Sequence, residues 1–126
     1  MLLWALTGNS KLPVKADEII NSPENVIFYS LISVWETAIK HMRHPENLKV
    51  SPGELVNYCE CSKMKCLALS IAHIYTLETL SRPDNAPPHK DPFDRILISQ
   101  AKSENMLFLT HDNTLTSYSE PCMIYV

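Results

Sequence analysis

The feature that most constrains this chain is an alternation of short, near-continuous apolar runs with longer amphipathic stretches. Such runs are typical of parallel strands that helices cover on both faces. We expect strands at 26–29, 66–69, 106–109 and 123–126. The pattern therefore predicts an α/β fold, a three-layer sandwich with a mostly parallel central sheet and right-handed crossovers.

Capping residues and prolines mark where the helices begin and end. Ser51 and Glu54 have the spacing of a capping box. Asp91 is expected to cap another helix, with Pro92 in the first turn of that helix. The segment 82–89 holds three prolines and is expected to be a loop. The expected helices are at about 2–6, 13–21, 32–42, from 51 onward, 71–80 and 91–101.

Length and charge limit the functions open to the chain. At 126 residues it has room for one domain, which we expect to span 1–126. No apolar run approaches the roughly 20 residues of a spanning helix, and no signal peptide is recognised. We therefore expect a cytoplasmic protein. The formal charge of -3 argues against binding nucleic acid through a large basic face, so any RNA contact should be small or depend on bound cations.

Acidic residues follow the predicted strands or open the predicted helices. Glu36 lies early in the helix after 26–29, Asp91 and Asp94 open another helix, and Asp112 directly follows 106–109. In an open parallel sheet, these positions meet at the carboxyl ends of the strands. Clustered carboxylates suit a hard cation such as Mg²⁺ or Mn²⁺, which promotes phosphodiester cleavage.

Each of these carboxylates also has an ordinary structural role. Asp91 is a good helix cap, Asp94 would favour the helix dipole, and Asp112 could cap a turn. Glu36 has the spacing of a surface ion pair with Lys40. Taken singly, each structural role is at least as probable as a metal-binding role. Only their convergence on one sheet edge favours a metal site.

Other reactive or aromatic side chains receive structural interpretations. Cys66 and Cys122 lie in apolar runs and are expected to behave as small buried hydrophobes. His41 and His44 are interpreted as a solvated helix end, and His89 and His111 as loop residues. The aromatic residues expected in the core are Trp4, Trp35, Phe93 and Phe108.

Four segments, taken in order, resemble one known family, the PIN-domain, VapC-like toxins of type II toxin–antitoxin pairs. Two of them are especially specific: the W-E-x-A-I-K helix of residues 30–40, and the H-x-D-P-F-D-R segment of residues 89–101. The other two are L-L-W-A-L at residues 2–6 and L-T-x-D at residues 109–112.

The resemblance implies a quartet of carboxylates that binds Mg²⁺ or Mn²⁺ for RNA cleavage. Glu36 matches the second carboxylate, Asp94 the third and Asp112 the fourth, with Asp91 as an accessory ligand. The family's first strand and its Asp-Thr-His motif would precede Met1, so we expect a domain truncated at its N-terminus. The resemblance also implies a cognate antitoxin, an RNA substrate and a homodimer.

Three functions stay open at this point. The first is a metal-dependent endoribonuclease toxin, although residues 1–126 alone are expected to be inactive or nearly so. The second is a catalytically inactive PIN remnant that retains the fold and the antitoxin-binding surface. The third and weakest is an unrelated α/β metal phosphatase.

Overall fold

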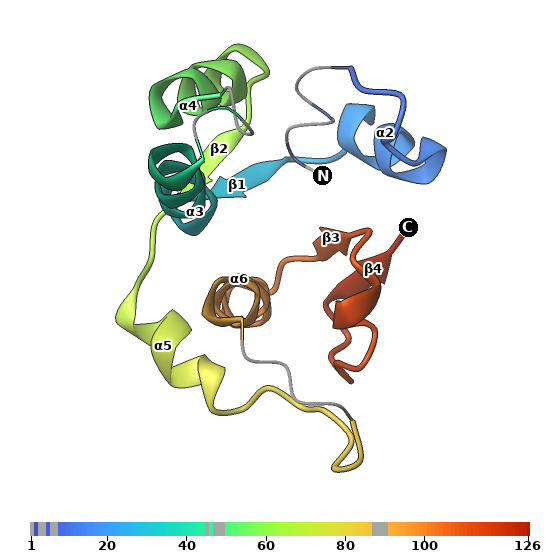
Figure 1. Ribbon diagram of the computed structural model, residues 1–126. Helices are drawn as coiled ribbons and strands as arrows, with labels where there is room; N and C mark the ends of the chain where they lie inside the picture. Colours follow the sequence, from blue (N-terminus) through green and yellow to red (C-terminus); the bar gives the residue numbers. More distant parts are fainter. Residues whose placement is uncertain (1, 3–4, 6–7, 45, 47–49, 87–90) are drawn as a thin grey trace. The chain divides into compact units, whose positions relative to one another are not determined.

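The computed structural model describes Leu2, Ala5, 8–44, 46, 50–86 and 91–126 (Figure 1). These residues belong to two compact units, Met1–Ala68 and Leu69–Val126, which we call the first and second unit and describe separately.

The first unit is built on two parallel strands. Strand β1 (Phe28–Ser30) pairs with β2 (Lys65–Leu67), with Tyr29 opposite Cys66. Because parallel strands need a crossover connection, helices lie between them in the sequence. The helices whose bounds the structure describes in this unit are α2 (Val14–Asn21), α3 (Leu31–Arg43) and α4 (Pro52–Cys61).

The second unit repeats the combination of helices with a parallel strand pair. Strand β3 (Phe108–Thr110) pairs with β4 (Met123–Tyr125), with Leu109 opposite Ile124. Its helices are α5 (Ile71–Leu77), α6 (Pro92–Ser103) and the short 3-10 helix η1 (Asn113–Leu115). The predicted α/β class with parallel strands is therefore confirmed, and each predicted strand segment overlaps an observed strand.

Helix boundaries agree closely with the capping signals. Ser51 Oγ accepts a hydrogen bond from Glu54 N–H at 3.2 Å, and Ser51 Oγ also bonds the Glu54 carboxylate at 3.3 Å.

Helix α5 ends at Leu77, three residues before the predicted end at Leu80. Both the backbone N–H and the hydroxyl of Thr79 bond the Thr76 carbonyl, which closes the helix in a tight turn. Of the predicted helix at 2–6, only Leu2 and Ala5 lie within the described residues.

A hydrophobic cluster centred on α4 forms the core of the first unit. Leu55 and Cys59 project from α4 and pack with Tyr29 of β1 and Met64. Leu55 is 1% exposed and Cys59 is 0% exposed. Burial raises the pKa of the Cys59 thiol to about 11, with smaller contributions from Cys66 and Glu60.

The core of the second unit joins α6 to the C-terminal segment. Ile98 of α6 packs with Leu115 of η1 and with Tyr118, and Phe108 and Cys122 pack against this cluster. The expected core position of Phe108 is confirmed, and Cys122 is partly buried as its apolar run suggested. Phe93 is half-buried.

Two expected core residues are instead exposed. Cys66 lies on β2, which among the described residues pairs only with β1, so its apolar run does not mark a strand covered on both faces. Trp35 is 56% exposed. Val34 packs against the first-unit core, and the next residue of a helix is turned by about 100° from it. The predictions for Cys66 and Trp35 were therefore wrong, and Trp4 lies outside the described residues.

The predictions for His44 and His111 are supported, whereas His41 is half-buried within α3. His44 ends α3 and is exposed, with its Nδ1 3.8 Å from a carboxylate oxygen of Glu46, which fits a solvated helix end. His111 lies after β3 and bonds the backbone oxygen of Val126. His89 lies outside the described residues.

In the described parts of the chain, no helix is long and apolar enough to cross a membrane.

The burial of Cys59 predicts a large difference in thiol reactivity within α4. The thiolate is the form that reacts with alkylating agents, and Cys59 stays protonated until the pH approaches about 11. At pH 8, iodoacetamide should label Cys59 about 100-fold or more slowly than the exposed Cys61. Peptide mass spectrometry over time measures both rates, and the difference should disappear in urea. Equal rates in the native protein would contradict the described core.

Candidate functional site

Glu36 is positioned by the direct passage of β1 into α3. Ser30 ends the strand, and its Oγ caps the helix by accepting a hydrogen bond from Ile32 N–H at 3.0 Å. Glu36 therefore lies in the second turn of the helix that begins at the carboxyl end of β1. Its carboxylate lies 3.5 Å from Lys40 Nζ, and the side chains of Glu36 and Lys40 are 25% and 63% exposed. The expected ion pair is confirmed, and at this exposure it contributes little to stability.

Asp91 and Asp94 open helix α6. Asp91 Oδ1 accepts hydrogen bonds from the N–H groups of Phe93 at 2.9 Å and Asp94 at 3.4 Å, and Pro92 follows in the first turn. The predicted cap is confirmed. Asp94 lies in the first turn and is half-buried, where a carboxylate interacts favourably with the helix dipole.

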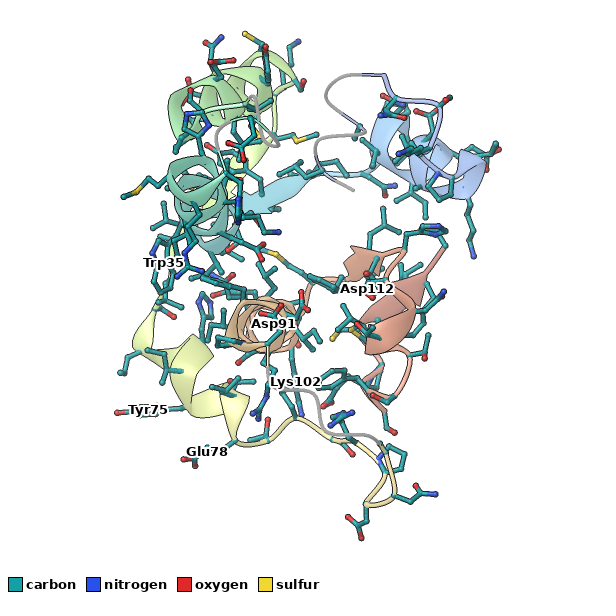
Figure 2. The ribbon with its side chains drawn as sticks, in the orientation of Figure 1. Trp35, Tyr75, Glu78, Asp91, Lys102 and Asp112 are labelled. Atoms are coloured by element: carbon teal, nitrogen blue, oxygen red, sulfur yellow. The ribbon has the colours of Figure 1, made fainter. Side chains whose placement is uncertain are left out.

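Asp112 stands two residues beyond the end of β3. Its N–H donates to Thr110 Oγ1 at 3.1 Å, which fixes the backbone as it leaves the strand. Its Oδ1 accepts from the N–H of Thr114 at 2.9 Å and from the Thr114 hydroxyl at 2.7 Å. The predicted turn-capping role is confirmed. Figure 2 labels Asp112 beside β3 and Asp91 at α6.

The four acidic residues are divided between the two units. Glu36 belongs to the first unit, and Asp91, Asp94 and Asp112 belong to the second. Within the described parts of the chain, no group of three or more His, Cys, Asp or Glu side chains is arranged to hold a metal ion. The shared acidic pocket of Glu36, Asp94 and Asp112 stays a prediction. Their carboxylate oxygens are nevertheless the donors that hard divalent cations prefer.

An arginine–tyrosine cluster accompanies Asp94, and the sequence analysis assigned it no role. We define it as Arg82, Arg95, Ser117 and Tyr118. Arg82 donates to Ser117 Oγ from Nε at 3.1 Å and from Nη2 at 3.0 Å, and its guanidinium lies 5.2 Å from the centre of the Tyr118 ring. Burial raises the pKa of Tyr118, while the charges of Arg95 and Arg82 oppose that rise and Asp94 reinforces it.

A buried histidine forms a second group that sequence reasoning missed. His73 of α5 is 1% exposed. Its Nδ1 accepts from Ser70 N–H at 3.0 Å, and its Nε2 lies 2.7 Å from Glu104 Oε1. Because a backbone N–H can only donate, Nδ1 is the acceptor and Nε2 carries the proton in this arrangement. The Ser99 hydroxyl also donates to the His73 carbonyl, so the group links α5 to α6.

An ion pair fixes the other side of α6. Lys102 Nζ lies 2.6 Å from Glu120 Oε1 and donates to the Thr79 carbonyl at 2.9 Å. The Glu120 side chain is 3% exposed, so a charge partner is needed to offset its desolvation. Lys102, which Figure 2 labels, thereby ties α6 both to the turn after α5 and to the segment before β4.

Comparison with known families gives the class of protein. The family model of the PIN domain matches residues 1–121, and the chain therefore belongs to the PIN domain family. The match extends across both units. PIN domains are generally nucleases and typically use divalent metal ions, so a nuclease acting on nucleic acid is the class that membership indicates. No curated protein and no solved structure matches the chain.

The cap at Asp91 predicts how α6 responds to substitution. Asp91→Ala removes the acceptor of two backbone N–H groups and should destabilise the protein by about 1 kcal/mol. Asp91→Asn should change stability far less, because asparagine caps helices about as well as aspartate. Urea denaturation of both variants measures this difference. An alanine variant as stable as the wild type would contradict the capping geometry.

Proposed function

We propose that this chain is the toxin of a type II toxin–antitoxin pair and acts in the cytoplasm as a metal-dependent endoribonuclease. The observation that carries the proposal is the PIN family match over residues 1–121. It is supported by the VapC-like motifs that contain the acidic residues. The proposed partners are a cognate antitoxin, an RNA substrate and a second copy of the chain.

In this proposal Glu36, Asp94 and Asp112 hold Mg²⁺ or Mn²⁺, and Asp91 is an accessory ligand. Local geometry supports these roles, because Asp91 and Asp94 open a helix and Asp112 lies just beyond a strand. Glu36 lies in the second turn of the helix that directly follows β1. Capping and ligation are compatible, since a carboxylate has two oxygens and about four acceptor sites. The caps at Asp91 and Asp112 engage Oδ1 and thereby hold each carboxylate in a fixed orientation.

The chain's own residues would position rather than attack the substrate. When bound, the divalent ion would neutralise phosphate charge and lower the pKa of its water ligand. The caps restrict the rotamers of Asp91 and Asp112, and the ion pair with Lys40 restricts Glu36. Preorganised side chains of this kind reduce the entropy lost when a substrate binds.

Conversion of one carboxylate to an amide tests the metal-site assignment. In a chain that carries the upstream motif, RNA cleavage should require Mg²⁺ or Mn²⁺ and stop with EDTA. Asp94→Asn should lower cleavage by about 100-fold or more, because it removes ligand charge without removing volume. The melting temperature should change little. Asp84→Asn, an exposed aspartate in the same unit, is the matched control and should retain activity.

The outcomes separate the competing functions. Full activity of Asp94→Asn would move the third ligand elsewhere, with Asp91 as the first candidate. Absence of cleavage by the unmodified, extended chain, combined with binding of an antitoxin, would support the inactive remnant instead. Hydrolysis of small phosphate esters but not of RNA would indicate a phosphatase.

A second prediction concerns the first carboxylate of the quartet. We expect residues 1–126 alone to be nearly inactive and less stable than a version extended by an apolar strand and Asp-Thr-His. A fourth carboxylate would bind the cation more tightly, and an added strand would supply partners for backbone groups at the sheet edge. Melting temperature and Mn²⁺-dependent RNA cleavage compare the two forms. Equal stability and activity would contradict this expectation.

A further inference from the structure

We propose that Thr114 is a positioning residue that sets the cation affinity of the proposed metal site, because its hydroxyl orients the Asp112 carboxylate. This inference rests on the proposed function, in which Asp112 is a metal ligand. Thr114 lies in η1, two residues after Asp112, and both residues are exposed. Thr114 is not one of the acidic positions that the family resemblance marks.

The first step is the double attachment of Asp112 to one residue. Asp112 Oδ1 accepts a hydrogen bond from the N–H of Thr114 at 2.9 Å and another from the Thr114 hydroxyl at 2.7 Å. Any residue other than proline at position 114 could supply the N–H, whereas the second bond needs a hydroxyl. A hydrogen bond from a hydroxyl to a carboxylate at this distance belongs to the stronger class in proteins. Two donors on one oxygen restrict the carboxylate more than a backbone cap alone.

The second step is the fixed position of the Thr114 side chain itself. The next residue, Leu115, is 1% exposed and packs with Ile98 and Tyr118 in the core of the second unit. The Leu115 N–H also donates to the Asp112 carbonyl at 3.2 Å. Threonine is β-branched and therefore has few side-chain rotamers. The core that holds the turn thus also holds the hydroxyl, and the hydroxyl passes this rigidity to the carboxylate.

The third step is the contrast with the other capped carboxylate, Asp91. Both hydrogen bonds that Asp91 Oδ1 accepts come from backbone N–H groups, which stay in place when side chains are replaced. At Asp112 one of the donors is a side chain, so substitution can change the orientation of this carboxylate. Removing a group that hydrogen-bonds to a metal ligand typically weakens metal binding by about 10- to 100-fold. The Thr114 hydroxyl is therefore expected to contribute measurably to cation affinity.

A purely structural role for the Thr114 hydroxyl makes a different prediction. In that case its hydrogen bond only closes the turn after β3, and its loss would lower stability without changing the affinity for cations. Thr116 provides a matched control in the same segment, because it is also exposed and its hydroxyl donates to the Asn113 carbonyl at 2.8 Å. Replacing either threonine by valine removes one hydroxyl and keeps the shape of the side chain.

The experiment measures Mn²⁺ binding in the absence of RNA, through the electron paramagnetic resonance signal of the unbound ion. The titration is made on residues 1–126 and on the chain extended upstream by an apolar strand and Asp-Thr-His. In both forms, Thr114→Val should weaken Mn²⁺ binding by about 10-fold or more. Thr114→Ser keeps the hydroxyl and should bind Mn²⁺ about as tightly as the wild type. Thr116→Val should leave the affinity unchanged.

Melting temperatures show whether each variant is folded, and Thr114→Ala carries the test if Thr114→Val fails to fold. A folded Thr114→Val chain that binds Mn²⁺ as tightly as the wild type would overturn this inference and leave the proposed metal site intact. Equal weakening in Thr114→Val and Thr116→Val would also overturn it, since the effect would then come from the turn as a whole. If neither wild-type form binds Mn²⁺, the proposed metal-dependent function is itself overturned, and this inference with it.

Discussion

The second unit depends on the burial of α6 on two sides at once. Ile98 packs into the apolar cluster, while the next two residues, Ser99 and Gln100, face the buried His73 of α5. Polar groups buried this deeply cost free energy unless they are hydrogen-bonded. Their partners come from α5, so the same bonds that satisfy them also fix the axis of α6. The direction of Asp91 and Asp94 at its N-terminus follows from that packing.

The sequence predicted the local parts of this arrangement well. Caps at Ser51 and Asp91 depend on contacts within a few residues, and apolar runs at the strands depend on side chains that are adjacent in the chain. The turn at Asp112 was visible for the same reason. The local backbone conformation around each carboxylate of the candidate site was therefore predictable. The structure also shows the structural role that the sequence suggested for each of them, as a helix cap, a first-turn carboxylate or an ion-pair partner.

The features that were missed depend on contacts between distant residues. Nothing near His73 indicates that Glu104 will supply its partner, and nothing near Arg82 indicates a ring at Tyr118. Trp35 was misplaced because helical spacing defines a stripe without saying which edge of the stripe faces the core. The convergence expected for Glu36, Asp94 and Asp112 stays a prediction, and it is of the same long-range kind because it rests only on the rule that parallel strands present their carboxyl ends at one edge.

The caps at Asp91 and Asp112 are compatible with the metal-binding role proposed for these residues. A helix cap needs an oxygen held next to backbone N–H groups, and a metal ligand needs an oxygen held in a fixed direction. At Asp91 and Asp112 the cap already restricts the carboxylate before any cation binds. A structural role at these positions therefore does not argue against a functional one. It supplies the rigidity that a hard cation with strict geometry requires.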